Sequence, residues 1–129
     1  IYNSYQGEEF DKTAFPYIRQ IIPEISTPDP ETVKALMAPE VAATIPDEKF
    51  IRAMRFFSKL GALQSIDEPE FSEAHVDRET DIGRQTILEY KIDARYENDE
   101  AEINLQLLKK GSSYEIYRFN FSSELLLSS

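Results

Sequence analysis

The second half of the chain alternates apolar and polar residues. Residues 89–108 read EYKIDARYENDEAEINLQLL, with apolar side chains at every second position on both sides of Asn98-Asp99. This period of two is typical of strands with one buried face, and Asn-Asp tolerates the positive φ angles of a type I′ turn. The pattern predicts a hairpin whose buried face pairs Tyr96 with Ala101, Ala94 with Ile103, Ile92 with Leu105, and Tyr90 with Leu107. A slip by one residue would turn the whole apolar set toward water.

The same alternation predicts three long strands, at about 86–97, 100–109 and 114–122, and a short edge strand near 71–76. The turn in KKGSS leaves two alternatives open. A two-residue loop turns Ile116 inward and requires a bulge near Arg118. A three-residue loop, which we favour, extends the buried face and leaves four apolar residues together on the otherwise polar face: Ile87, Leu108, Tyr114 and Ile116.

The first half of the chain has the helical period instead. In TAFPYIRQIIPEI, apolar residues recur at spacings of three and four, and Pro23 predicts a kink or an early end. A second helix begins with Asp29 as N-cap and Pro30 at the first helical position, and Pro39 stops it. A third helix runs from PDEKF to Gly61, which suits the left-handed position after a helix. Its predicted buried side is formed by Phe50, Met54 and Phe57, flanked by Ile51 and Leu60.

These elements predict an α+β fold, with N-terminal helices packed on a curved antiparallel sheet of about four strands. At 129 residues we expect a single domain over 1–129, with a helical part at about 11–61 and a sheet part at about 70–123. The formal charge of −10 argues against nucleic acids and anionic lipid surfaces, which select Lys/Arg clusters. The chain has no cysteine and no apolar run long enough to span a membrane.

Candidate chemistry is sparse. The four glycines are too scattered for a phosphate-binding loop, and the single histidine, His75, excludes a multi-histidine metal site. His75 with Glu73 or Asp77 would be an acid–base pair on one strand face, but a lone histidine at a sheet edge is more often solvated. The stretch DRETDIG has its glycine and closing acid out of place for a calcium loop. We therefore predict no catalytic residue, no metal site and no cofactor.

A ligand pocket between the helices and the sheet is a second candidate. Its walls would be formed by aromatic side chains: Tyr17, Phe57, Tyr90, Tyr96, Tyr117, Phe119 and Phe121. The alternative is that these aromatic residues fill the core completely.

The order of elements, with FIRAMRFFSKLGAL before a sheet that ends in AEINLQLLKKGSSYEIYRFNF, resembles the cystatin-like α+β roll of the nuclear transport factor two-like superfamily, and within it small bacterial domains. The resemblance covers about residues 13–123. It implies a bent sheet around the helices, homodimers formed through the sheet, and export or association with the cell envelope. Enzymes of that superfamily carry acid and base residues inside the cone. The inward positions here are apolar or aromatic, so those catalytic roles do not transfer.

Three functions follow as hypotheses. The first is a non-catalytic binding or interaction domain, which uses either the pocket for a small apolar ligand or the four-residue apolar patch for homodimerisation. The second is an isomerase or dehydratase of the same roll, and the third a purely structural extracytoplasmic module. Because the chain begins with Ile1, we expect an upstream segment, such as a signal peptide, to have been removed. A periplasmic or secreted location follows from the resemblance, and the sequence leaves a cytoplasmic one open.

Overall fold

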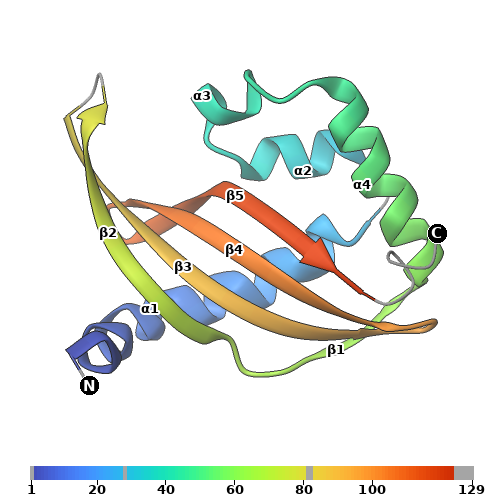
Figure 1. Ribbon diagram of the computed structural model, residues 1–129, viewed down its shortest axis with the longest axis horizontal. Helices are drawn as coiled ribbons and strands as arrows, with labels where there is room; N and C mark the ends of the chain where they lie inside the picture. Colours follow the sequence, from blue (N-terminus) through green and yellow to red (C-terminus); the bar gives the residue numbers. More distant parts are fainter. Residues whose placement is uncertain (1, 28, 81–82, 124–129) are drawn as a thin grey trace.

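The computed structural model describes residues 2–27, 29–80 and 83–123, which form an α+β fold of four helices followed by a five-stranded antiparallel sheet (Figure 1). The helices are α1 (Tyr2–Ile25), α2 (Pro30–Leu36), α3 (Pro39–Ala42) and α4 (Asp47–Leu60). The strands are β1 (Leu63–Ile66), β2 (Glu70–Thr80), β3 (Gly83–Tyr96), β4 (Glu100–Lys110) and β5 (Ser113–Ser122). The predicted fold class is confirmed, with one strand more than the sequence indicated.

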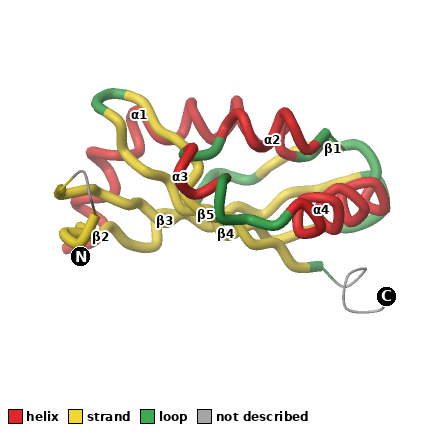
Figure 2. Tube along the Cα trace, turned by 90° about the horizontal axis from the view of Figure 1, so that it is seen from above, coloured by secondary structure: helices red, strands yellow, loops and turns green. Residues whose placement is uncertain are grey.

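Helix α1 lies across one face of the sheet (Figure 2). Its buried stripe has the spacing expected of a helix face and consists of Ala14, Ile18, Ile21, Ile22 and Ile25. Pro16 and Pro23 both lie inside the helix with exposed rings. Of the kink or early end predicted at Pro23, the early end is wrong, because the helix continues to Ile25, whose side chain is completely buried. The anchoring of this last turn in the core outweighs the one hydrogen bond that Pro23 removes.

The shorter helices follow their local signals closely. Asp29 caps α2, where its carboxylate accepts a hydrogen bond from the Glu31 amide at 3.1 Å, and Pro30 occupies the first helical position, as predicted. Helix α3 was not predicted. The buried face of α4 contains Phe50, Ala53, Met54, Phe56, Phe57 and Leu60. Ile51, expected beside that face, is instead 46% exposed.

The sheet has the order β1-β3-β4-β5, and β2 also pairs with β3. Strands β1 and β2 follow one another along the same edge of β3: β1 pairs with residues 94–96, and β2 with residues 83–91. Pro69 separates the two, which fits the absence of an amide donor at that position. The predicted edge strand near 71–76 is confirmed as part of β2, whereas β1 was missed.

The β3–β4 hairpin has the predicted buried face in a different register. Ile92 lies opposite Ile103 rather than Leu105, a shift of two residues. The Tyr96 amide donates to the Asp99 carbonyl at 2.9 Å, which places Glu97-Asn98 at the tip. None of the described non-glycine residues has a positive φ, so the predicted type I′ turn is wrong. A shift of two leaves every side chain on its original face, and Ile92, Ile103 and Leu105 are all completely buried.

The register follows from a contact between the hairpin tip and the end of α4. The Asn98 side-chain amide donates to the Lys59 carbonyl at 2.8 Å, and the Asn98 backbone amide donates to the Leu60 carbonyl at 2.9 Å. Both carbonyls belong to the last turn of α4, where no helical donor remains. In return, the Ala62 amide donates to the Glu97 carboxylate at 2.7 Å. These bonds require Glu97 and Asn98 at the tip.

The β4–β5 connection is a two-residue loop, not the three-residue loop that we favoured from the sequence. Lys110 pairs with Ser113 across a two-residue turn, Leu107 pairs with Ile116, and the register then shifts so that Gln106 pairs with Arg118. The bulge expected near Arg118 is therefore present, and the three-residue loop is wrong. A bulge adds one residue to one strand and reverses which side chains face the core beyond it.

The bulge also decides where the four residues of the predicted apolar patch lie. Ile116 and Tyr114 turn inward and join the main core, at 0% and 4% exposure. Ile87 and Leu108 stay on the opposite face, where Ala38 and partly buried Val41 and Tyr117 cover them in a second small cluster: Ala38, Ile87 and Leu108. The four residues therefore do not form an exposed patch: Tyr114 and Ile116 face the main core, and the segment around α3 covers Ile87 and Leu108.

Candidate functional site

The seven predicted pocket residues are not gathered around one cavity. Phe57, Tyr90 and Tyr96 are buried in the main core, where Tyr17, Phe119 and Phe121 pack against them. The ring centroids of Phe57 and Phe121 lie 5.0 Å apart. Tyr117 lies on the opposite face of the sheet, beside the second cluster. Helix α1 occupies the space on the inner face where the sequence placed a pocket (Figure 2).

The hydroxyl groups of the inward tyrosines bind α1 rather than a ligand. Among the described residues, Tyr90 bonds to Asp11 at 2.7 Å and Tyr114 to Thr13 at 2.7 Å, both in α1, and Tyr96 bonds to Ser26, just after the helix, at 2.6 Å. Burial, and then the bond to Asp11, raise the pKa of Tyr90 far above its ordinary value. The Tyr90 hydroxyl therefore keeps its proton at neutral pH and donates it to Asp11, which helps to hold α1 in place.

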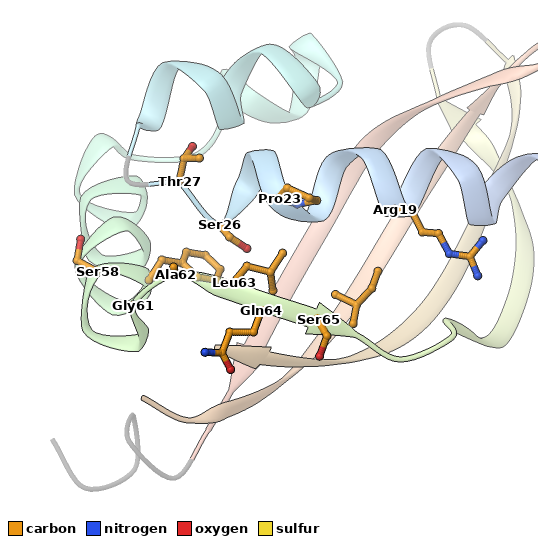
Figure 3. A pocket seen from close by; sticks show the side chains of 12 residues that line it. Arg19, Pro23, Ser26, Thr27, Ser58, Gly61, Ala62, Leu63, Gln64 and Ser65 are labelled. Carbon is orange, nitrogen blue, oxygen red and sulfur yellow. The ribbon is translucent and has the colours of Figure 1, made fainter. Parts of the chain in front are cut away.

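A groove of about 990 Å³ opens at the surface where α1, α4 and β1 meet (Figure 3). One wall is the C-terminal half of α1, with Arg19 and Pro23, and the turn that follows it, with Ser26 and Thr27. The other wall is residues 61–66, from the end of α4 along β1, and Phe57 and Ser58 of α4 complete the lining. Of the predicted pocket residues, Phe57 alone reaches this groove.

The position of the groove follows from two local signals. Gly61 has a φ of +84°, which ends α4 and turns the chain into β1 alongside α1. Ser26 donates its hydroxyl to the Ile22 carbonyl at 2.7 Å, and Thr27 donates to the Glu24 carbonyl at 2.7 Å, so both hydroxyls close the end of α1. The lining is therefore held by the ends of two helices and an edge strand.

The charge of the groove differs from that of the whole chain. Arg19 is its single charged lining residue, while the protein carries a net charge of −10. The Arg19 guanidinium lies 5.5 Å from the centre of the Phe15 ring, a cation–π contact. Within the described part of the chain, no carboxylate forms a salt bridge with Arg19. No acid and no histidine lines the groove, so it presents no acid–base pair.

A second hollow, of about 880 Å³, lies around the turn end of the β3–β4 hairpin. Its lining is strongly acidic and includes Asp67, Asp93, Glu97, Asp99, Glu100 and Glu102. Arg95 in this hollow forms a salt bridge with Glu100, its cross-strand neighbour. Across the residues whose placement is described, no group of three or more acids or histidines is arranged to hold a metal ion.

His75 lies away from both hollows. It is exposed on β2, opposite Ile87 of β3. The DRETDIG stretch includes residues 81–82, which lie outside the described residues. None of the helices in the described chain combines the length and apolar character needed to cross a membrane.

Sequence reasoning missed the groove because it missed β1. LQSI has neither the length nor the alternation of the later strands, and Gly61 was interpreted only as a helix end. Arg19, Ser26 and Thr27 appeared as ordinary polar positions of a helix. Their one distinguishing signal is Pro23, which interrupts the hydrogen-bond ladder of α1 on the groove side.

Comparison of the chain with models of protein families, with curated proteins and with solved structures gave no significant match.

Proposed function

We propose that this chain is a non-catalytic binding domain whose ligand site is the groove between α1, α4 and β1. The observation that carries the proposal is the groove itself: an open hollow of about 990 Å³ with mixed apolar and polar walls on a well-packed scaffold. Binding sites commonly combine such volume with a few placed polar groups. Arg19, Gln64 and Ser65 supply those groups here.

The geometry favours binding over the two alternatives. An isomerase or dehydratase needs an acid or base at its cavity, and the lining residues of this groove include neither a carboxylate nor an imidazole. A purely structural module needs no hollow of this size. Homodimerisation through the sheet stays a prediction; it would use the polar outer face rather than the four apolar residues that the chain itself buries.

Membership of the nuclear transport factor two-like superfamily is part of the same proposal. An antiparallel sheet packed against a long N-terminal helix is compatible with a cystatin-like roll. The described lining of the groove contains no Asp, Glu or His, which fits a binding member better than an enzymatic one. Export across a membrane stays a prediction from the resemblance.

The experiment is a fragment screen by NMR on the ¹⁵N-labelled chain, with a variant that fills the groove. Ala62→Trp places a large ring in the groove, and Ala35→Trp places the same ring on an exposed position of α2 outside it. We expect fragments to shift the amide signals of residues 61–66. These shifts should disappear in Ala62→Trp and persist in Ala35→Trp. Shifts that survive in Ala62→Trp, or that map to other residues, would contradict the proposed site.

A further inference from the structure

We propose that the groove takes an extended acidic peptide, which adds as a strand to the free edge of β1 and places a carboxylate at Arg19. This inference rests on the proposed function and names its ligand class. Strand addition uses main-chain hydrogen bonds for affinity and side-chain positions for specificity. The groove contains the parts that this binding mode needs: an unpaired strand edge, a facing wall and a charge at one end.

The free edge is supplied by β1. In the described sheet β1 pairs with β3 on one side and with no strand on the other. The Asp67 amide donates to the Asp93 carbonyl at 2.8 Å, so this residue directs its backbone groups toward β3. Backbone direction alternates along an antiparallel pair, and Ile66 is paired with Ala94. The N–H and C=O of Ile66 therefore point away from β3, toward the open edge.

The α1 wall of the groove adds a backbone carbonyl that is not used as an acceptor within the helix. Pro23 has no N–H, so the carbonyl of Arg19, four residues earlier, lacks its usual helical donor. Both residues line the groove, and this carbonyl therefore lies on the groove side of α1. The hydroxyls of Ser26 and Thr27 are already bound to helix carbonyls. An occupant with its own N–H groups, such as a peptide backbone, matches this wall.

The shape and the charge select the class of peptide. Residues 61–66 line the groove in an unbroken run, which corresponds to about 17 Å of extended chain. An open hollow of this length fits a segment of five or six residues better than an enclosed small molecule. Figure 3 places Arg19 near the end of β1 that carries Ser65, at the opposite end from Gly61. A carboxylate there meets the one charge that lines the groove.

The test begins with random nonapeptides displayed on phage and selected on the immobilised chain. Selected peptides are resynthesised, titrated by NMR, and methylated at one backbone nitrogen at a time. We expect acidic sequences whose affinity falls more than tenfold when the nitrogen that pairs with Ile66 is methylated and is unchanged at the nitrogens on either side, because Ile66 directs its backbone groups to the open edge and its regular neighbours do not. Arg19→Glu should weaken binding by about tenfold. The matched charge reversal Arg52→Glu, exposed on α4 away from the groove, should leave binding within about twofold.

The outcomes separate this inference from the proposed function. Peptides whose affinity does not depend on which nitrogen is methylated, or that lose equally in Arg19→Glu and Arg52→Glu, overturn strand addition at Arg19. If fragments still shift residues 61–66 in that case, the groove remains a binding site for another ligand class. If neither peptides nor fragments shift those amides, both proposals fail.

Discussion

Replacing Gly61 by alanine tests whether the hairpin tip and the end of α4 stabilise each other. Gly61 has φ +84° and ψ −160°, a conformation in which essentially only glycine is free of strain. An added Cβ would lie 3.0 Å from the Glu97 Cβ and 3.0 Å from its carboxylate oxygen. The substitution therefore strains the backbone and displaces the turn that caps the helix.

Gly111→Ala is the control for the loss of stability expected in Gly61→Ala. Gly111, in the β4–β5 turn, also has a positive φ, of +63°, but its added Cβ would meet nothing within 4 Å. Gly111→Ala should cost about 1 kcal/mol, which is the left-handed strain less the entropy that alanine removes from the unfolded chain. Gly61→Ala carries about 1–3 kcal/mol of strain and weakens hairpin hydrogen bonds of about 0.5–1.5 kcal/mol each. We expect a total near 3 kcal/mol.

The assay is equilibrium urea unfolding of the wild type and both variants, followed by circular dichroism. The free energy of unfolding should fall by about 3 kcal/mol in Gly61→Ala and by about 1 kcal/mol in the control. Thermal unfolding of the same samples should show a Tm that is lower by about 12 °C and about 4 °C. If the two variants lose the same free energy of unfolding, the contact between the tip and α4 contributes nothing and our account of the β3–β4 register is refuted.

Two further predictions concern burial. Leu108→Ala should lower the free energy of unfolding by about 2–4 kcal/mol, because Leu108 is completely buried under the α3 segment; a change below about 0.5 kcal/mol in urea unfolding would restore the exposed patch. Burial, then the charges of Glu115 and Glu24, raise the pKa of Tyr17 from 10.0 to about 12. The folded state holds this proton more tightly, so its contribution to stability is full below pH 10 and is lost as pH rises to about 12. Spectrophotometric titration at high pH should show one tyrosine fewer in this range for Tyr17→Phe, and an unchanged curve would contradict the assignment.

Within the β3–β4 hairpin, the sequence by itself determined which residues face the core. The period of two along residues 88–108 placed Tyr90, Ile92, Leu105 and Leu107 on one face, and all four are completely buried. The helix limits at Asp29 and Gly61 were equally readable, because each depends on the chemistry of one residue and its immediate neighbours.

What the sequence left undecided depends on partners far apart in the chain. A register shift of two preserves every face, so alternation cannot distinguish Ile92 opposite Leu105 from Ile92 opposite Ile103. The choice was made by hydrogen bonds between Asn98 and the end of α4, across 39 residues.

The candidate site also depends on elements that are far apart in the chain. The cover over Leu108 comes from α3, and the groove exists because α1 and β1, at opposite ends of the helical region, are brought side by side. Local patterns determine which face of an element is apolar. Only tertiary packing determines which other element meets that face and where a hollow remains between them.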